Sequence, residues 1–253
     1  MNPLVVRERF HLLALCHLAL RLVGRRWAVK EGICLRFFHG SPRFSLDMDL
    51  DVAPSLRSET LRKSVEGGLA SRALAAALAP AGVNAVRFSA TKQTAVTQRW
   101  KVALELGTGN SVPTKLEFSR RTDVSVFTAG MPSGTVLEAH GMPSFVAQYY
   151  GADTLAAQKI RALASPTRNA GRDIFDLHHL FSRGLAAPGR VGRLVEPGDA
   201  RKASGKVESF SMASFRAEVV PFLPEDLAGP LEKRGAIEKM AEELRGYLAG
   251  MVR

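Results

Sequence analysis

The segment RFSLDMDLDV, residues 43–52, carries acidic side chains at alternate positions. In a strand every second residue lies on the same face, so Asp47 and Asp49 would lie about 6.5 Å apart along one face. Two such carboxylates can bind hard divalent cations, which prefer oxygen ligands. Metal ions held in this way stabilise the charge that develops during phosphoryl or nucleotidyl transfer. The spacing therefore predicts a Mg²⁺ site, with Mn²⁺ as the alternative metal.

A purely structural role for these acids is a weaker explanation. Asp51 continues the same face, and three aspartates on one strand face repel one another and are poor strand formers. A calcium-binding loop is excluded by two positions. Val52 stands where its sharp turn needs glycine, and Ser58 stands where a bidentate glutamate is needed.

A third carboxylate is expected from a neighbouring strand. The segment TKLEFS, residues 114–119, alternates apolar Leu116 and Phe118 with polar Lys115 and Glu117. We therefore select Glu117 as the third metal ligand. The alternative is a surface glutamate on an edge strand.

The pattern of apolar residues predicts the elements that would position these groups. It favours an α+β fold with a core at residues 1–145 and a mainly helical C-terminal domain at 146–253. Strands are expected at 44–52, 86–90, 99–106 and 114–119, and helices at 6–23, 33–39, 57–80, 154–164, 173–182 and within 210–250. Residues 186–209 are rich in glycine, proline and charge, which predicts an exposed basic loop.

Composition points to an anionic partner in a reducing compartment. The 253 residues carry a net charge of +11, and this excess is typical of proteins that meet phosphate backbones, although a basic proteome would also explain it. The two cysteines are too few for a disulfide framework, which favours the cytoplasm. The apolar run at residues 10–23 is interrupted by His11, His17 and Arg21 and is too short to span a bilayer, so no membrane contact is expected.

The second half holds one lysine and two aspartates of interest. Lys159 has apolar neighbours at three- and four-residue offsets, so its ammonium would need an anion such as a triphosphate unless its stem packs and its amine reaches water. Asp173, with Asp176 three residues later, precedes an apolar run. That spacing is typical of helix capping as well as of chemistry.

Three segments in this order carry a resemblance to a known family. They are KEGICLRFFHGSPRFSLDMDLDV at 30–52, AAQKIRAL at 156–163 and GRDIFDLHHLF at 171–181. The combination of RFSxDxD, a helical lysine and RDxxDL resembles the AbiEii/AbiGii toxin family of nucleotidyltransferases, which includes the MenT toxins. The resemblance covers most of the chain.

The resemblance implies a nucleotidyltransferase-like mixed sheet with flanking helices, followed by a helical domain. It implies transfer of NMP from an NTP to an acceptor with release of pyrophosphate, most simply to the 3′ end of a tRNA, and a cognate antitoxin as partner. It places catalytic roles on Asp47, Asp49, Lys159, Asp173 and Asp176. It places NTP contacts on Lys30, Gly32, Arg43, Ser45 and Lys159, and metal binding on Asp47 and Asp49, to which Glu117 is added from the strand pattern.

One departure keeps a second hypothesis open. Where the family has a turn of small residues such as Gly-Gly-Thr after the lysine, this chain has Glu31-Gly32-Ile33, and a carboxylate there disfavours a nearby phosphate. A catalytically decayed scaffold that binds RNA is therefore the alternative. An enzyme that modifies a protein or small-molecule hydroxyl would use the same metal site.

Overall fold

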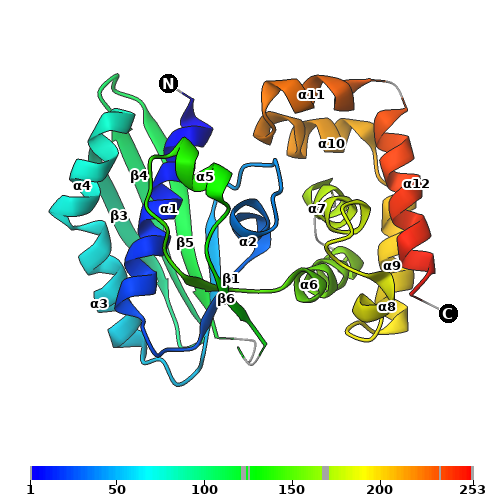
Figure 1. Ribbon diagram of the computed structural model, residues 1–253, viewed down its shortest axis with the longest axis horizontal. Helices are drawn as coiled ribbons and strands as arrows, with labels where there is room; N and C mark the ends of the chain where they lie inside the picture. The colour runs from blue at the N-terminus through cyan, green and yellow to red at the C-terminus, as the bar shows by residue number, and fades with distance from the viewer. Residues whose placement is uncertain (1, 121–123, 125, 167–170, 234, 252–253) are drawn as a thin grey trace. The chain divides into compact units, whose positions relative to one another are not determined.

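A mixed seven-stranded sheet organises the N-terminal part of the computed structural model, which describes residues 2–120, 124, 126–166, 171–233 and 235–251 (Figure 1). The strand order is β3-β4-β5-β2-β1-β7-β6. The strands are β1 Trp27–Lys30, β2 Met48–Val52, β3 Val83–Gln93, β4 Thr97–Leu106, β5 Ser111–Ser119, β6 Thr128–Gly130 and β7 Ala147–Tyr149. The short strand β2 lies between antiparallel β1 and parallel β5, so both of its edges are hydrogen-bonded.

Helices cover one face of strands β3 to β5. The helices of this unit are α1 Pro3–Arg21, α2 Glu31–Phe38, α3 Ser58–Leu69, α4 Arg72–Leu78 and α5 Gly134–Ala139, with a 3₁₀ turn η1 at Ala79–Ala81. Helix α1 packs against α3, α4 and β5, while α4 packs against β3. Residues 57–80 were expected to form one helix, but they form two, because Ser71 accepts a hydrogen bond from the Leu74 amide and begins α4.

The alternation along β4 separates the two faces. Trp100, Val102 and Leu104 are buried, and the Trp100 indole donates to Glu66 of α3. The alternate residues Arg99, Lys101 and Ala103 are more exposed. One face of the sheet is therefore apolar and covered by helices, while the other carries the polar side chains.

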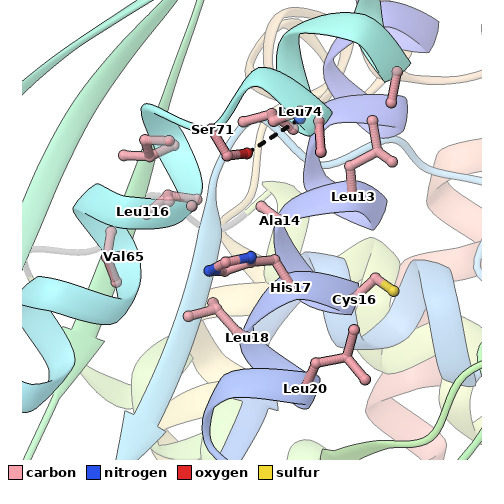
Figure 2. Close-up of a pocket in the computed structure, with 14 residues that line it drawn as sticks. Leu13, Ala14, Cys16, His17, Leu18, Leu20, Val65, Ser71, Leu74 and Leu116 are labelled. Atoms are coloured by element: carbon pink, nitrogen blue, oxygen red, sulfur yellow. Dashed lines mark hydrogen bonds between the residues drawn. The ribbon is translucent and has the colours of Figure 1, made fainter.

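An apolar pocket of about 310 Å³ lies between α1 and the α3–α4 segment (Figure 2). Its walls are mostly aliphatic, with Leu18, Val65 and Leu74 among them, and the His17 ring is one of its few polar groups. Leu116 reaches it from the helix-covered face of the sheet. Because neither Asp47 nor Asp49 lines this pocket, it is separate from the predicted chemistry.

Two adjacent glycines in α3 should respond oppositely to alanine. At Gly67 a Cβ would meet no atom within 4 Å. Gly67→Ala should therefore raise the free energy of unfolding by about 0.5–1 kcal/mol, because alanine has the higher helix propensity. At Gly68 a Cβ would lie 2.6 Å from the His17 ring, whose Nε2 is 3.1 Å from the Ser64 carbonyl oxygen. Moving that ring should make Gly68→Ala destabilising by about 1–3 kcal/mol.

Urea unfolding followed by tryptophan fluorescence measures both changes. Both tryptophans, Trp27 and Trp100, lie in the unit that contains α3. Equal midpoints for the two variants would contradict the close packing of His17 against α3.

The chain divides into two compact units. The first comprises Met1–Phe38 and Phe44–Tyr150, and the second comprises His39–Arg43 and Gly151–Arg253. The sheet continues past residue 145 because β7 pairs with β1 through Val29 and Tyr149. The α+β fold class expected from the sequence is confirmed by this mixed sheet with its helices.

The second unit is helical in its described part. Its helices are α6 Ala152–Ala164, α7 Gly171–Ser182, α8 Pro188–Val191, α9 Pro197–Glu208, α10 Met212–Glu218, α11 Glu225–Glu232 and α12 Ala236–Ala249, with η2 at Val220–Phe222. Helix α12 packs against α7 and α9, and α6 packs against α7 and α9. One of its apolar clusters joins Phe175, Phe215, Val219, Leu223, Ile237 and Met240.

The basic segment at 186–209 is not a loop throughout, contrary to the expectation from its composition. Its second half forms α9, which begins at Pro197, a residue suited to the first turn because it lacks an amide hydrogen. Ala200, Ala203 and Val207 recur at helical spacing and are buried. Burial of this small apolar face stabilises the helix despite the glycine and charged residues of the segment.

Within the described ranges, no helix combines the length and apolar character needed to cross a bilayer.

Candidate active site

Asp47 and Asp49 lie at the beginning of β2, in the middle of the sheet. Asp49 is opposite Glu117 in the parallel pairing of β2 with β5, and opposite Lys30 in the pairing with β1. Asp47 immediately precedes the strand. The two side chains remain partly accessible, with relative exposures of 33% for Asp47 and 20% for Asp49. Both carboxylates are therefore held by the sheet and can still meet a ligand.

The residues before Asp47 are not a strand, although alternation predicted one from residue 44. Side chains bind the carbonyl groups that a strand would use: Ser45 Oγ donates to the Asp47 carbonyl at 2.9 Å, and Thr114 Oγ1 donates to the Leu46 carbonyl at 2.7 Å. His11 Nε2 lies 2.7 Å from the same Thr114 oxygen. Because Thr114 uses its hydrogen on Leu46, His11 must donate through Nε2.

His11 is suited to this fixed role. Burial and the neighbouring Arg7 lower the pKa of His11 to about 3, against a smaller opposite effect of Glu8. The imidazole is therefore neutral at physiological pH and holds one tautomer. Through Thr114 it fixes the backbone from which Asp47 projects.

Lys115 lies among the acidic groups. Its Nζ is 3.1 Å from Asp47 Oδ2, 3.9 Å from Asp49 Oδ1 and 3.9 Å from Glu117 Oε2. Burial alone would lower the pKa of Lys115, but the carboxylates outweigh burial and raise it. Lys115 is thus a stable cation at the point where the negative charges converge.

One lysine does not balance the charge around Asp49. Burial is the main cause that raises the pKa of Asp49 to about 6, and the negative charges of Glu31, Asp47 and Glu117 add to it while Lys115 opposes it. A carboxylate in this environment favours an added cation. Mg²⁺ commonly uses only one or two protein carboxylates together with substrate phosphates, so the pair Asp47 and Asp49 fits that ion chemically.

Glu117 is engaged with a different partner. Arg99 Nε donates to Glu117 Oε2 at 2.6 Å. In the described part of the chain no three His, Cys, Asp or Glu side chains are grouped so that they could share a metal ion. The donor set that fits a metal is therefore the aspartate pair, and a ligand role for Glu117 stays a prediction.

The unusual Glu31 adopts a left-handed backbone conformation, with φ of 57°, at the start of α2. Residues other than glycine rarely adopt this conformation, which costs about 1 kcal/mol or more. Gly32 follows as a buried residue of α2. Lys30 forms an ion pair of 2.5 Å with buried Asp51, whose other oxygen accepts from Tyr150 at 3.0 Å. This pairing gives Asp51, the third aspartate of the strand, a structural role.

A second charged cluster is buried in the helical unit. Asp176 is fully buried and accepts from Arg43 through Nε at 2.9 Å and a terminal nitrogen at 2.6 Å. Lys159 Nζ is 2.8 Å from Asp176 Oδ2 and 3.0 Å from Asp173 Oδ1. Burial raises the pKa of Asp176, but Arg43 and Lys159 outweigh this effect and lower it to about 2.

These contacts supply the anion that Lys159 was expected to need. The two aspartates bind it within the same unit, and Asp173 lies in the first turn of α7. Arg43, predicted to contact NTP, is only 4% exposed and is held by Asp176. The cluster thus fixes the segment 39–43 to α7, and direct roles of its members in NTP binding or catalysis stay predictions.

Sequence reasoning missed several residues that shape the site. Lys115 was placed on the same side as Glu117 by alternation, but its approach to Asp47 depends on the pairing of β5 with β2. Thr114 and His11 had no signal in the sequence, because a buried threonine and a helix histidine are ordinary core residues.

Two aspartates at the central strand of a mixed sheet, beside a lysine, suit metal-assisted nucleotidyl transfer. The family model described as "Nucleotidyl transferase AbiEii toxin, Type IV TA system" matches residues 13–250. The chain belongs to this AbiEii family, and the predicted resemblance and the predicted enzyme class are confirmed. Membership implies an NTP substrate and an antitoxin partner.

Solved structures share the fold at low sequence identity. JHP933 from Helicobacter pylori is 16% identical, with a TM-score of 0.58 over 100% of this chain and 93% of that chain. The nucleotidyltransferase toxin MenT4 (Rv2826c) from Mycobacterium tuberculosis H37Rv is 16% identical, with a TM-score of 0.59, and the match covers 99% of this chain and 92% of that chain. A putative nucleotidyltransferase from H. pylori is 17% identical, with a TM-score of 0.57, and the match covers 97% of this chain and 93% of that chain. No curated protein sequence matches the chain.

Proposed function

We propose that this nucleotidyltransferase toxin is metal-dependent, that it acts in the cytoplasm, and that it transfers NMP from an NTP to the 3′ end of a tRNA. The observation that carries the proposal is the pair Asp47 and Asp49, partly accessible and with excess negative charge that a divalent cation would neutralise. The chain's net charge of +11 supports an RNA acceptor.

In the proposed reaction the acceptor hydroxyl oxygen forms a bond to the α-phosphorus of the NTP. The bond from that phosphorus to the bridging oxygen of the β-phosphate breaks, pyrophosphate leaves, and the hydroxyl proton passes to water or to a carboxylate. Asp47 and Asp49 would hold Mg²⁺, which supplies positive charge next to the phosphate oxygens. Lys115 adds a second positive charge beside the two aspartates.

The test is a transfer assay with the purified chain, total tRNA, each α-labelled NTP in turn, and Mg²⁺ or Mn²⁺. We expect label on tRNA with at least one NTP, none when EDTA replaces the metal, and one pyrophosphate released for each nucleotide added. Label on the protein or on a small molecule would contradict the tRNA acceptor but keep the enzyme. Transfer that persists in EDTA would contradict the metal dependence.

A further inference from the structure

The pocket beside Asp47 is lined by more basic than acidic side chains. It has a volume of about 720 Å³ and lies on strands β3 to β5, within the first unit. Its charged lining residues are Arg7, Arg87, Arg99, Lys101, Lys115 and Asp47. Five cations and one acid line the pocket, and that acid is one of the two predicted metal ligands. Arg87 and Arg99 also pair with Glu105 and Glu117, which are not among the lining residues.

The strand pairing arranges part of this charge in a row. Lys101 of β4 is opposite Lys115 of β5 on one side and opposite Ser89 of β3 on the other. Lys115 in turn contacts Asp47 at 3.1 Å. Neighbouring strands are about 4.8 Å apart, so the two lysines lie one strand spacing apart, and the neutral Ser89 follows on β3.

Lys101 gains little stability from its place beside Lys115, whose own charge is balanced by Asp47. Like charges directly opposite each other on adjacent strands are destabilising, and Lys101 and Lys115 form such a pair. Lys101 is exposed, and among the described residues it is in no ion pair. An anion bound over the row would offset the repulsion.

Two other cations of the pocket, Arg87 and Arg99, are accessible to a ligand. Arg87 pairs with Glu105 and Arg99 pairs with Glu117, and all four side chains are partly exposed. Ion pairs of this kind are worth little in water, so an incoming phosphate could compete for either arginine. A ligand with several phosphates in series would meet several of these cations together.

We infer that this face of β3, β4 and β5 binds the sugar-phosphate backbone of the acceptor nucleic acid and leads its reacting end to Asp47. The inference rests on the proposed function, because it assigns the acceptor path to the same site. A stacked strand advances about 3.4 Å per nucleotide, so Lys115 and Lys101, about 4.8 Å apart, can each meet one of two neighbouring phosphates. A protein acceptor would need no such series of cations.

The test compares charge reversal at Lys101 with the same change at Lys63, an exposed lysine of α3 in the same unit. Binding of a labelled single-stranded RNA of about ten nucleotides is measured by fluorescence anisotropy at several KCl concentrations. We expect Lys101→Glu to weaken binding about tenfold and to reduce the slope of log K against log[KCl] by about 1, and Lys63→Glu to change affinity less than twofold. Circular dichroism verifies that both variants are folded.

Equal affinities of the two variants for RNA would overturn the inference. Binding of Mg²⁺–NTP to the wild-type chain is measured separately by equilibrium dialysis, so that the two proposals can fail independently. If the wild type binds NTP and Lys101→Glu retains full RNA affinity, the assignment of the RNA-binding surface is wrong, and the proposed nucleotidyltransferase activity is not affected. If the wild type binds neither NTP nor RNA, the proposed function fails first and this inference fails with it.

Discussion

Asp49→Asn should abolish nucleotidyl transfer and at the same time stabilise the first unit at neutral pH. The amide keeps the shape of the side chain but removes a charge that would hold the metal ion. Loss of several kcal/mol of transition-state stabilisation corresponds to a rate at least about a thousandfold lower. Asp47→Asn should lose transfer to a similar degree, and both are measured in the labelled-NTP assay.

The stability gain follows from the raised pKa of Asp49. Its folded-state pKa of about 6 lies above the ordinary value of 3.8, so the folded chain binds more protons between these pH values. The free energy of unfolding therefore falls as pH rises from about 4 to about 6. Above about pH 6 this loss of stability, which is the penalty for ionising Asp49, stays constant. Asparagine avoids the penalty, so Asp49→Asn should be about 1–3 kcal/mol more stable at pH 7.5 and equal to the wild type at pH 4.

Glu59→Gln in α3 is the matched control, because Glu59 is exposed and its ion pairs are loose. It should change neither transfer nor the urea midpoint by tryptophan fluorescence. Retention of more than a tenth of wild-type transfer by Asp49→Asn would contradict a metal-binding role for Asp49. A stability gain that persists at pH 4 would contradict the electrostatic cause.

The aspartate pair could be predicted because its signal is local. Alternation over residues 47–51 places Asp47, Asp49 and Asp51 on one side of an expected strand, and the cost of that arrangement requires an explanation. The strand pairings then separate their roles, since Asp51 is balanced by Lys30 of β1. Periodicity within one strand cannot reveal which acid has a partner on the next strand.

The charged cluster of the helical unit could not be paired from sequence. Arg43 and Asp176 are separated by 133 positions, and each is an ordinary polar residue beside an apolar run. Lys159 was expected to seek an anion because of its apolar neighbours, which is the correct physical requirement. The identity of the anion depends on how α6 packs against α7, and only the structure gives that contact.

Asp176→Asn should destabilise the helical unit by about 3–5 kcal/mol. The change leaves Arg43 and Lys159 buried with Asp173 as the remaining carboxylate of the cluster, and removal of one partner from a buried ion pair has a cost of this size. Amide hydrogen exchange in α6 and α7 measures the effect, because both tryptophans lie in the other unit. Asp153→Asn is the control: its partner Arg190 is 55% exposed, so the loss should be about 1 kcal/mol or less.

Two further measurements separate charge balance from packing. The pKa of Asp176 is lowered to about 2, so its stabilising effect is complete above about pH 4 and is lost as pH falls through 2. The variant should therefore approach the wild type in acid, as followed by circular dichroism. The double change Arg43→Met with Asp176→Leu removes one cation together with its anion and leaves Lys159 paired with Asp173, so it should recover most of the lost stability. If the double variant is as unstable as Asp176→Asn, the cluster contributes through shape and hydrogen bonding rather than through charge balance.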